Sequence, residues 1–77
     1  MRLGRFYVTS EFYRSDKIMI AMQRDMAILN VRIAYDAANT YEFMATGEMF
    51  DEVPDYNIVP QYKVLIDSDL NFTFERI

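Results

Sequence analysis

Apolar and polar residues alternate with a period of two along most of this chain, and this pattern predicts a β-sheet. Residues 3–13 place Phe6, Val8 and Phe12 on one side, and aromatic and β-branched residues, which favour strands, are frequent among them. Four further stretches alternate in the same way: 31–36, 41–46, 61–67 and 71–77. We therefore expect four to five strands.

The stretch 31–36 is expected to point Val31, Ile33 and Tyr35 inward. Between the strands, residues 48–60 are expected to form an irregular excursion. Pro54 and Pro60 lie within it, and proline removes the hydrogen-bond donor that a central strand requires.

Residues 16–29 fit two patterns. Their apolar side chains alternate in part like a strand, but they also form a helical stripe: Ile18, Met19, Met22, Met26 and Leu29. Ser15 is a good N-cap, Asp16 suits a first helical turn, and Asn30 can end a helix in the left-handed conformation. We favour the helix, which gives an α+β fold of order β-α-β-β-β-β, a small antiparallel sheet with one helix packed on it. If 16–29 is a strand, the fold is an all-β meander.

The 77 residues make one domain, residues 1–77. Their apolar content of 52% argues against disorder and exceeds what a core of this size hides easily. We therefore expect the surplus to be covered by a partner or by a second copy, as in a homodimer.

The composition excludes much chemistry. Without Cys or His the chain has no thiol nucleophile, no Ser-His-Asp arrangement and few zinc or haem ligands. We expect no enzyme activity and no cofactor. The longest apolar run is 18–22, far short of a membrane span, and the first residues do not resemble a signal peptide, so a soluble cytoplasmic protein is expected.

Charge is distributed unevenly along the chain. Residues 1–35 hold six basic and three acidic side chains, whereas residues 36–77 hold two basic and nine acidic ones. Between Arg32 and Lys63 there are six acids and no base. This stretch could present a negative face to a basic groove and block it, although acidic side chains also serve solubility.

We therefore expect a non-enzymatic protein-binding domain, an inhibitor or modulator that occupies a basic surface of a partner. In size and charge alone, with no shared motif, the chain resembles the small accessory proteins of viruses and mobile elements. The predicted contact consists of charged residues with two apolar anchors: Glu48, Phe50, Asp51, Glu52, Asp55 and Tyr56.

Two other functions stay open. A nucleic-acid binder would use the basic N-terminal half and requires four basic side chains to share one face: Arg5, Arg14, Lys17 and Arg24. The overall acidity makes this less favoured. A self-assembling protein would instead pair its first or last strand across a two-fold axis.

One acidic motif is read as a turn. Asp67, Asp69 and Asn71 match the opening of a calcium loop, but Phe72 stands where that loop needs glycine. Asp, Ser and Asn are also common in hairpin turns because they hydrogen-bond the backbone. We expect no metal here.

Overall fold

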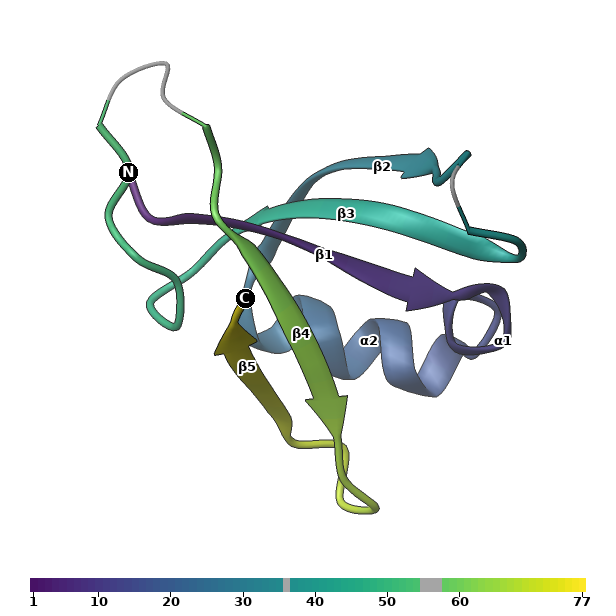
Figure 1. The fold of residues 1–77 in the computed structure, drawn as a ribbon. Helices are drawn as coiled ribbons and strands as arrows, with labels where there is room; N and C mark the ends of the chain where they lie inside the picture. Colours follow the sequence, from purple (N-terminus) through teal and green to yellow (C-terminus); the bar gives the residue numbers. More distant parts are fainter. Residues whose placement is uncertain (36, 55–57) are drawn as a thin grey trace.

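The computed structural model describes residues 1–35, 37–54 and 58–77. Five strands and two helices follow one another along the chain (Figure 1). They are β1 (Leu3–Thr9), α1 (Ser10–Tyr13), α2 (Asp16–Asp25), β2 (Ala27–Ile33), β3 (Thr40–Thr46), β4 (Gln61–Ile66) and β5 (Phe72–Arg76). The α+β class, the five strands and the packed helix are confirmed.

The sheet has the order β2-β3-β1-β4-β5. Neighbouring strands are antiparallel except for β1 and β4, which are parallel. The sheet is therefore mixed, whereas the sequence predicted antiparallel strands throughout. The cause is the long connection between β3 and β4. β3 ends where β1 begins, with Thr46 opposite Leu3, and β4 starts at the same end, beside Arg5 and Phe6, so it runs parallel to β1.

The helix expected at 16–29 forms as α2 but ends at Asp25. Its start follows the sequence signals, since the Ser15 hydroxyl accepts a hydrogen bond from the Ile18 N–H. Met26 already has an extended backbone, and Ile28 and Val31 pair with β3 beside its buried residues. Asn30 lies in β2 after a register shift and does not cap the helix. Tertiary pairing with β3 thus overrides the helical pattern of residues 27–29.

The first strand is shorter than its alternation predicted. It ends at Thr9, whose hydroxyl caps the single turn α1 by accepting a hydrogen bond from the Phe12 N–H. Within β1 the predicted faces are correct, because Phe6 and Val8 are fully buried and Arg5 is not. Residues 10–13 are helical because a side-chain cap competes locally with the ladder.

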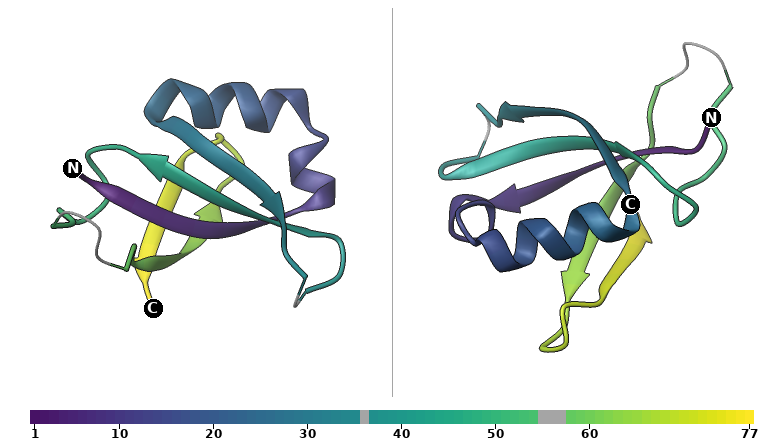
Figure 2. Two further views of the ribbon diagram at one scale, coloured as in Figure 1. Left: turned by 90° about the horizontal axis from the view of Figure 1, so that it is seen from above. Right: turned by 180° about the vertical axis from the view of Figure 1, so that it is seen from behind.

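The core lies between the sheet and α2, which covers one face of it (Figure 2). Its largest fully buried side chains are Phe6, Phe43, Phe50, Met22 and Val8. Of the helical stripe predicted within residues 16–29, Met22 and Met26 are buried and Met19 packs against the core, whereas Leu29 is 51% exposed. The stripe therefore acts mainly as core.

Tyr35 departs most from expectation. It was predicted to point inward, but it is 96% exposed, and Ile33 is 59% exposed. The strand ends at Ile33, and Ala34 turns inward instead, with its N–H donating to the Thr40 carbonyl oxygen. The period-two pattern therefore fails one residue after the ladder ends.

We predict that Gly4→Ala lowers the free energy of unfolding by about 1–3 kcal/mol, as overpacked cores do. A Cβ at Gly4 would lie 2.4 Å from Cδ1 of the fully buried Phe50 ring, which has little room to move. Urea denaturation measures the loss. Gly47→Ala is the matched control, because the closest atom to its Cβ is the Sδ of the exposed Met49, which can rotate away. Equal losses in both variants would contradict this account.

Candidate functional site

The predicted acidic contact is partly built into the fold. Phe50, expected as an apolar anchor for a partner, is 1% exposed and stacks on Phe6 at a centroid distance of 6.1 Å. Its ring also packs against Tyr62 and Phe74. Phe50 is therefore a core residue, and its ring is not presented to a partner.

The acids beside Phe50 are bound to groups of the same chain. Asp51 forms an ion pair with Arg76, and Glu52 with the terminal amino group of Met1. That amino group, through its hydrogen bond and its charge, lowers the pKa of Glu52. Glu48 is exposed and forms no ion pair with the described residues. Asp55 and Tyr56, like Asp36 of the base-free stretch, lie outside the described residues.

This pairing sharpens the test of the acidic contact. If the segment binds a basic partner, Glu48→Lys should weaken binding while leaving the urea midpoint unchanged, because Glu48 has no described ion pair to lose. Asp51→Lys should also lower the midpoint, since it sets a cation beside Arg76. A triple variant replaces Glu48, Asp51 and Asp55 together by Lys. If neither Glu48→Lys nor this triple variant weakens binding, the segment is not the contact.

A different surface gathers at the end of the molecule where β1 leads into α1 and β2 turns into β3 (Figure 1). An open groove of about 470 Å³ lies there. We call it the hairpin groove, and its side walls include Arg14, Ile33, Tyr35, Asn39 and Tyr41. A volume above about 300 Å³ is in the range of ligand-binding sites.

Hydrogen bonds hold the walls of the hairpin groove. The Ser10 N–H, at the start of α1, donates to the Asn39 carbonyl oxygen at 2.7 Å, which ties α1 to the β2–β3 loop. Asn39 itself has φ 54°, the left-handed conformation that asparagine tolerates in tight turns. The Thr40 hydroxyl donates to the Ala38 carbonyl oxygen. The groove is thus preformed by backbone contacts.

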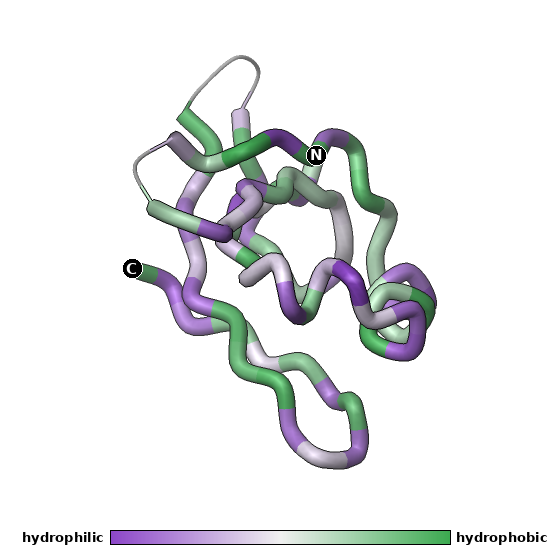
Figure 3. Tube along the Cα trace, turned by 90° about the vertical axis from the view of Figure 1, so that its right-hand side faces the viewer, coloured by the Kyte–Doolittle hydropathy of each residue, from purple (hydrophilic) through white to green (hydrophobic). Residues whose placement is uncertain are grey.

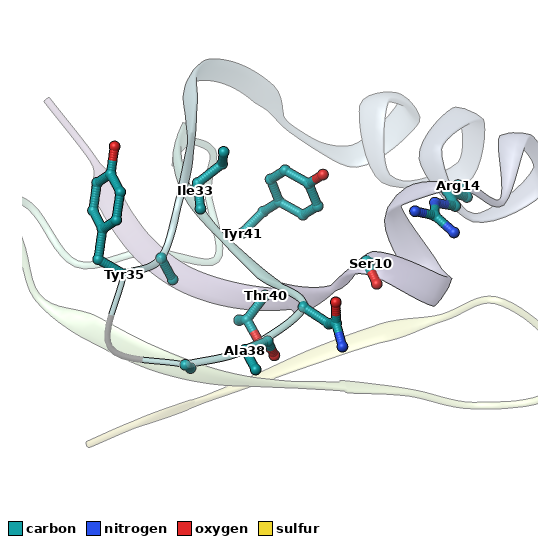
Figure 4. A pocket seen from close by; sticks show the side chains of 10 residues that line it. Ser10, Arg14, Ile33, Tyr35, Ala38, Thr40 and Tyr41 are labelled. Carbon is teal, nitrogen blue, oxygen red and sulfur yellow. The ribbon is translucent and has the colours of Figure 1, made fainter.

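The side chains of the groove are aromatic, aliphatic and cationic. Ile33 and Tyr41 face each other across the β2–β3 ladder, and the Tyr41 ring packs at a tilt against that of Tyr13, with a centroid distance of 4.4 Å. In Figure 4 the Arg14 guanidinium points from the helical turn toward the hairpin, and the Tyr35 ring stands away from the backbone that follows β2. Arg14 is exposed, and the described residues give its guanidinium no ion pair. Tyrosine and arginine are enriched at the energetic centres of protein interfaces.

The sheet face opposite α2 carries other cations, but an acid holds them. Glu42, with only 14% of its side chain exposed, bridges Arg32 at 2.6 Å and Arg5 at 3.8 Å. Arg24, on α2, hydrogen-bonds its neighbour Asp25 and lowers the pKa of that carboxyl. The cations named for nucleic-acid binding are thus spread over both sides of the sheet.

The 67–70 segment is the expected turn at the tip of β4 and β5, hydrophilic apart from Leu70 (Figure 3). One Asp67 carboxylate oxygen accepts hydrogen bonds from the N–H groups of Asn71 and Asp69, both at 2.9 Å. These bonds, with Asn71 contributing most, lower the pKa of Asp67 below 3.8. Its carboxylate organises the turn from within.

We predict that Asp67→Asn reduces the loss of stability in acid. Because the pKa of Asp67 is lower in the folded than in the unfolded chain, its contribution is complete above about pH 4 and is lost as the pH falls through the folded value. Asparagine keeps an acceptor but does not titrate. Urea midpoints at pH 7 and at about pH 3 should therefore lie closer together in the variant than in the unchanged protein. Equal pH slopes would refute the role of Asp67.

Comparisons with models of protein families, with curated proteins and with solved structures found no match for this chain. Among the described residues, no helix is long and apolar enough to cross a membrane. In the same ranges, no three acidic side chains gather closely enough to hold a metal ion. The hairpin groove is therefore judged on its own geometry.

Few features of the amino-acid sequence indicated this groove. Tyr35 was assigned to the core because the alternation of Val31 and Ile33 was extended past the strand end. Arg14 was considered only as one of the four cations of a nucleic-acid binder. The available signal was the segment 37–40, which lies between the expected strands 31–36 and 41–46. A loop there implies that the alternation of the preceding strand ends close to Tyr35.

Proposed function

We propose that this chain is a non-enzymatic protein-binding domain and that the hairpin groove, with Tyr35 at its rim, is its contact surface. The observation that carries the proposal is the 96% exposure of Tyr35 beside the 59% exposure of Ile33. A small domain with a complete aromatic core gains nothing in stability from these two side chains in solvent. Large apolar side chains that gather at an exposed site are typical of interaction surfaces.

The physical chemistry of the groove favours a protein as partner. Tyrosine brings a large contact area with few rotatable bonds to immobilise, and arginine adds charged hydrogen bonds. The hydrogen bonds of Ser10 and Ala34 fix the walls before any partner arrives, which lowers the entropic cost of binding.

The contact would extend beyond the groove. A stable interface buries about 800 Å² on each partner, and the whole chain exposes 5422 Å². The edge strand β2 offers the continuation, because it ends in Ile33 and carries the exposed Leu29. Both the groove and this edge strand would therefore contact the partner.

Other parts of the sequence-based expectation have less support. Asp51 and Glu52 are each paired with a positive group of the same chain, which neutralises much of the negative charge that an acidic face would present to a basic partner. A homodimer remains a prediction, and Ile33 and Tyr35 would be its natural contacts. Light scattering on Tyr35→Ala and on the unchanged protein tests this separately.

The proposal is tested by comparative capture from lysate of the native source with immobilised protein, followed by titration of the captured protein. Tyr35→Ala should weaken binding of a specific partner roughly thirtyfold or more, because truncation of an interface tyrosine at an energetic centre costs about 2 kcal/mol or more. Its urea midpoint should not change, because Tyr35 is outside the core.

The matched control is Ile20→Ala. Ile20 is 70% exposed on α2 and does not line the hairpin groove. A partner that is lost with Tyr35→Ala and kept with Ile20→Ala supports the proposal. A partner insensitive to both Tyr35→Ala and Ile33→Ala would show that another surface binds.

A further inference from the structure

We propose that the hairpin groove selects an extended acidic segment of its partner, in which a carboxylate stands next to an aliphatic or aromatic side chain. This inference rests on the proposed function and specifies the chemistry of the partner at the same surface. It is carried by the juxtaposition of Arg14, which forms no ion pair with any described residue, and the apolar pair Ile33 and Tyr41 in a preformed groove.

The charge of the groove is the first argument. Among its described lining residues, Arg14 carries a charge, and none of them is acidic. The neutral polar side chains in the walls, such as those of Ser10 and Asn39, do not neutralise the positive charge of the Arg14 guanidinium. Counted over the described lining residues, a chain with a net charge of −4 therefore carries a positive side chain at this end. A planar guanidinium pairs best with a carboxylate or a phosphate.

A second groove extends the positive site. It has a volume of about 390 Å³ and shares Ile33, Ala34 and Tyr35 with the hairpin groove. Arg5 and Arg32 line it together with one acid, Glu42. Tyr35 thus stands between two grooves, and arginines outnumber acids among the described lining residues of each.

The backbone of β2 supplies the third argument. β2 is an edge strand, and its pairing with β3 is regular from Asn30 to Ile33, beyond the irregularity that follows Ile28. A short extended peptide can add to such an edge by main-chain hydrogen bonds, with its alternate side chains directed into neighbouring pockets. The strand ends at the groove, so a peptide paired there would continue past Ile33 toward Arg14.

A nucleic-acid strand fits the same positive charge less well. Phosphate binding along a strand depends on several available cations in sequence. Here Arg5 and Arg32 are already bound to Glu42, and Arg14 is the charged group that lines the hairpin groove among the described residues. One carboxylate beside an apolar group matches this arrangement better.

Selection from a displayed library of random 12-residue peptides on the immobilised full chain tests the inference. Peptides recovered with the unchanged protein should be enriched in Asp or Glu next to an aliphatic or aromatic residue. With Arg14→Glu as the bait, the preference should shift to Lys or Arg. A selected acidic peptide, measured by fluorescence anisotropy, should bind Arg14→Ala about ten- to hundredfold more weakly, the usual effect of losing a charged hydrogen bond.

The outcomes separate this inference from the proposed function. Peptides that need Tyr35 but show no preference for acids would overturn the inference and leave the proposed function standing. Selected peptides that ignore Tyr35, Ile33 and Arg14 would overturn both. The inference would also be overturned if single-stranded oligonucleotides bind through Arg14 more tightly than the selected peptides. The same holds if the protein forms an oligomer in which one copy fills the groove of another, and Tyr35→Ala dissociates that oligomer. Ile20→Ala serves as the control bait and should select the same peptides as the unchanged protein.

Discussion

The close contact between the Phe50 ring and Gly4 is the constraint on which the rest of the structure depends. Phe50 belongs to the long connection after β3, and its ring occupies the space that a side chain at Gly4 would need. From there it contacts Phe6, Tyr62 and Phe74, which lie on β1, β4 and β5. One side chain thereby joins the connection to three strands, and it holds the chain where β4 can pair in parallel with β1.

The two ends of the sheet differ as a consequence. At the end where β1 begins, main-chain hydrogen bonds and the ion pair of Glu52 with the Met1 amino group fasten the connection 47–54 to the N-terminal segment. The ion pair of Asp51 with Arg76 fastens the same connection to β5. At the other end α1 and the β2–β3 loop meet and leave a groove between them. At the first end Asp51 and Glu52 are used within the fold, whereas the second end carries the exposed Tyr35 and Arg14, which has no ion pair among the described residues. For this reason we propose the second end, and not the first, as the contact surface.

The outcome of each sequence-based expectation depended on the range of the interaction involved. The start of α2 at Ser15 and the turn at Asp67 were predictable because a side chain bonds a backbone group two to four residues away. The burial of Phe6 and Val8 followed from alternation within one strand. The end of α2, the burial of Phe50 and the exposure of Tyr35 were not predictable, because each depends on a partner or a strand end that is distant in sequence or set by pairing. The same holds for Asp51, whose partner Arg76 is 25 residues away.

By itself, the sequence determined the class of the fold, the number of strands, the position of the helix start and the exclusion of thiol and imidazole chemistry. These properties follow from residue type and short-range periodicity, which act whatever the topology. Only the tertiary structure decided the parallel pairing of β1 with β4, the use of the acidic segment as an internal fastening and the gathering of Arg14, Ile33, Tyr35 and Tyr41 into one groove. The physical reason is that these contacts join residues far apart in the chain, and each forms only when the core has fixed both partners in space.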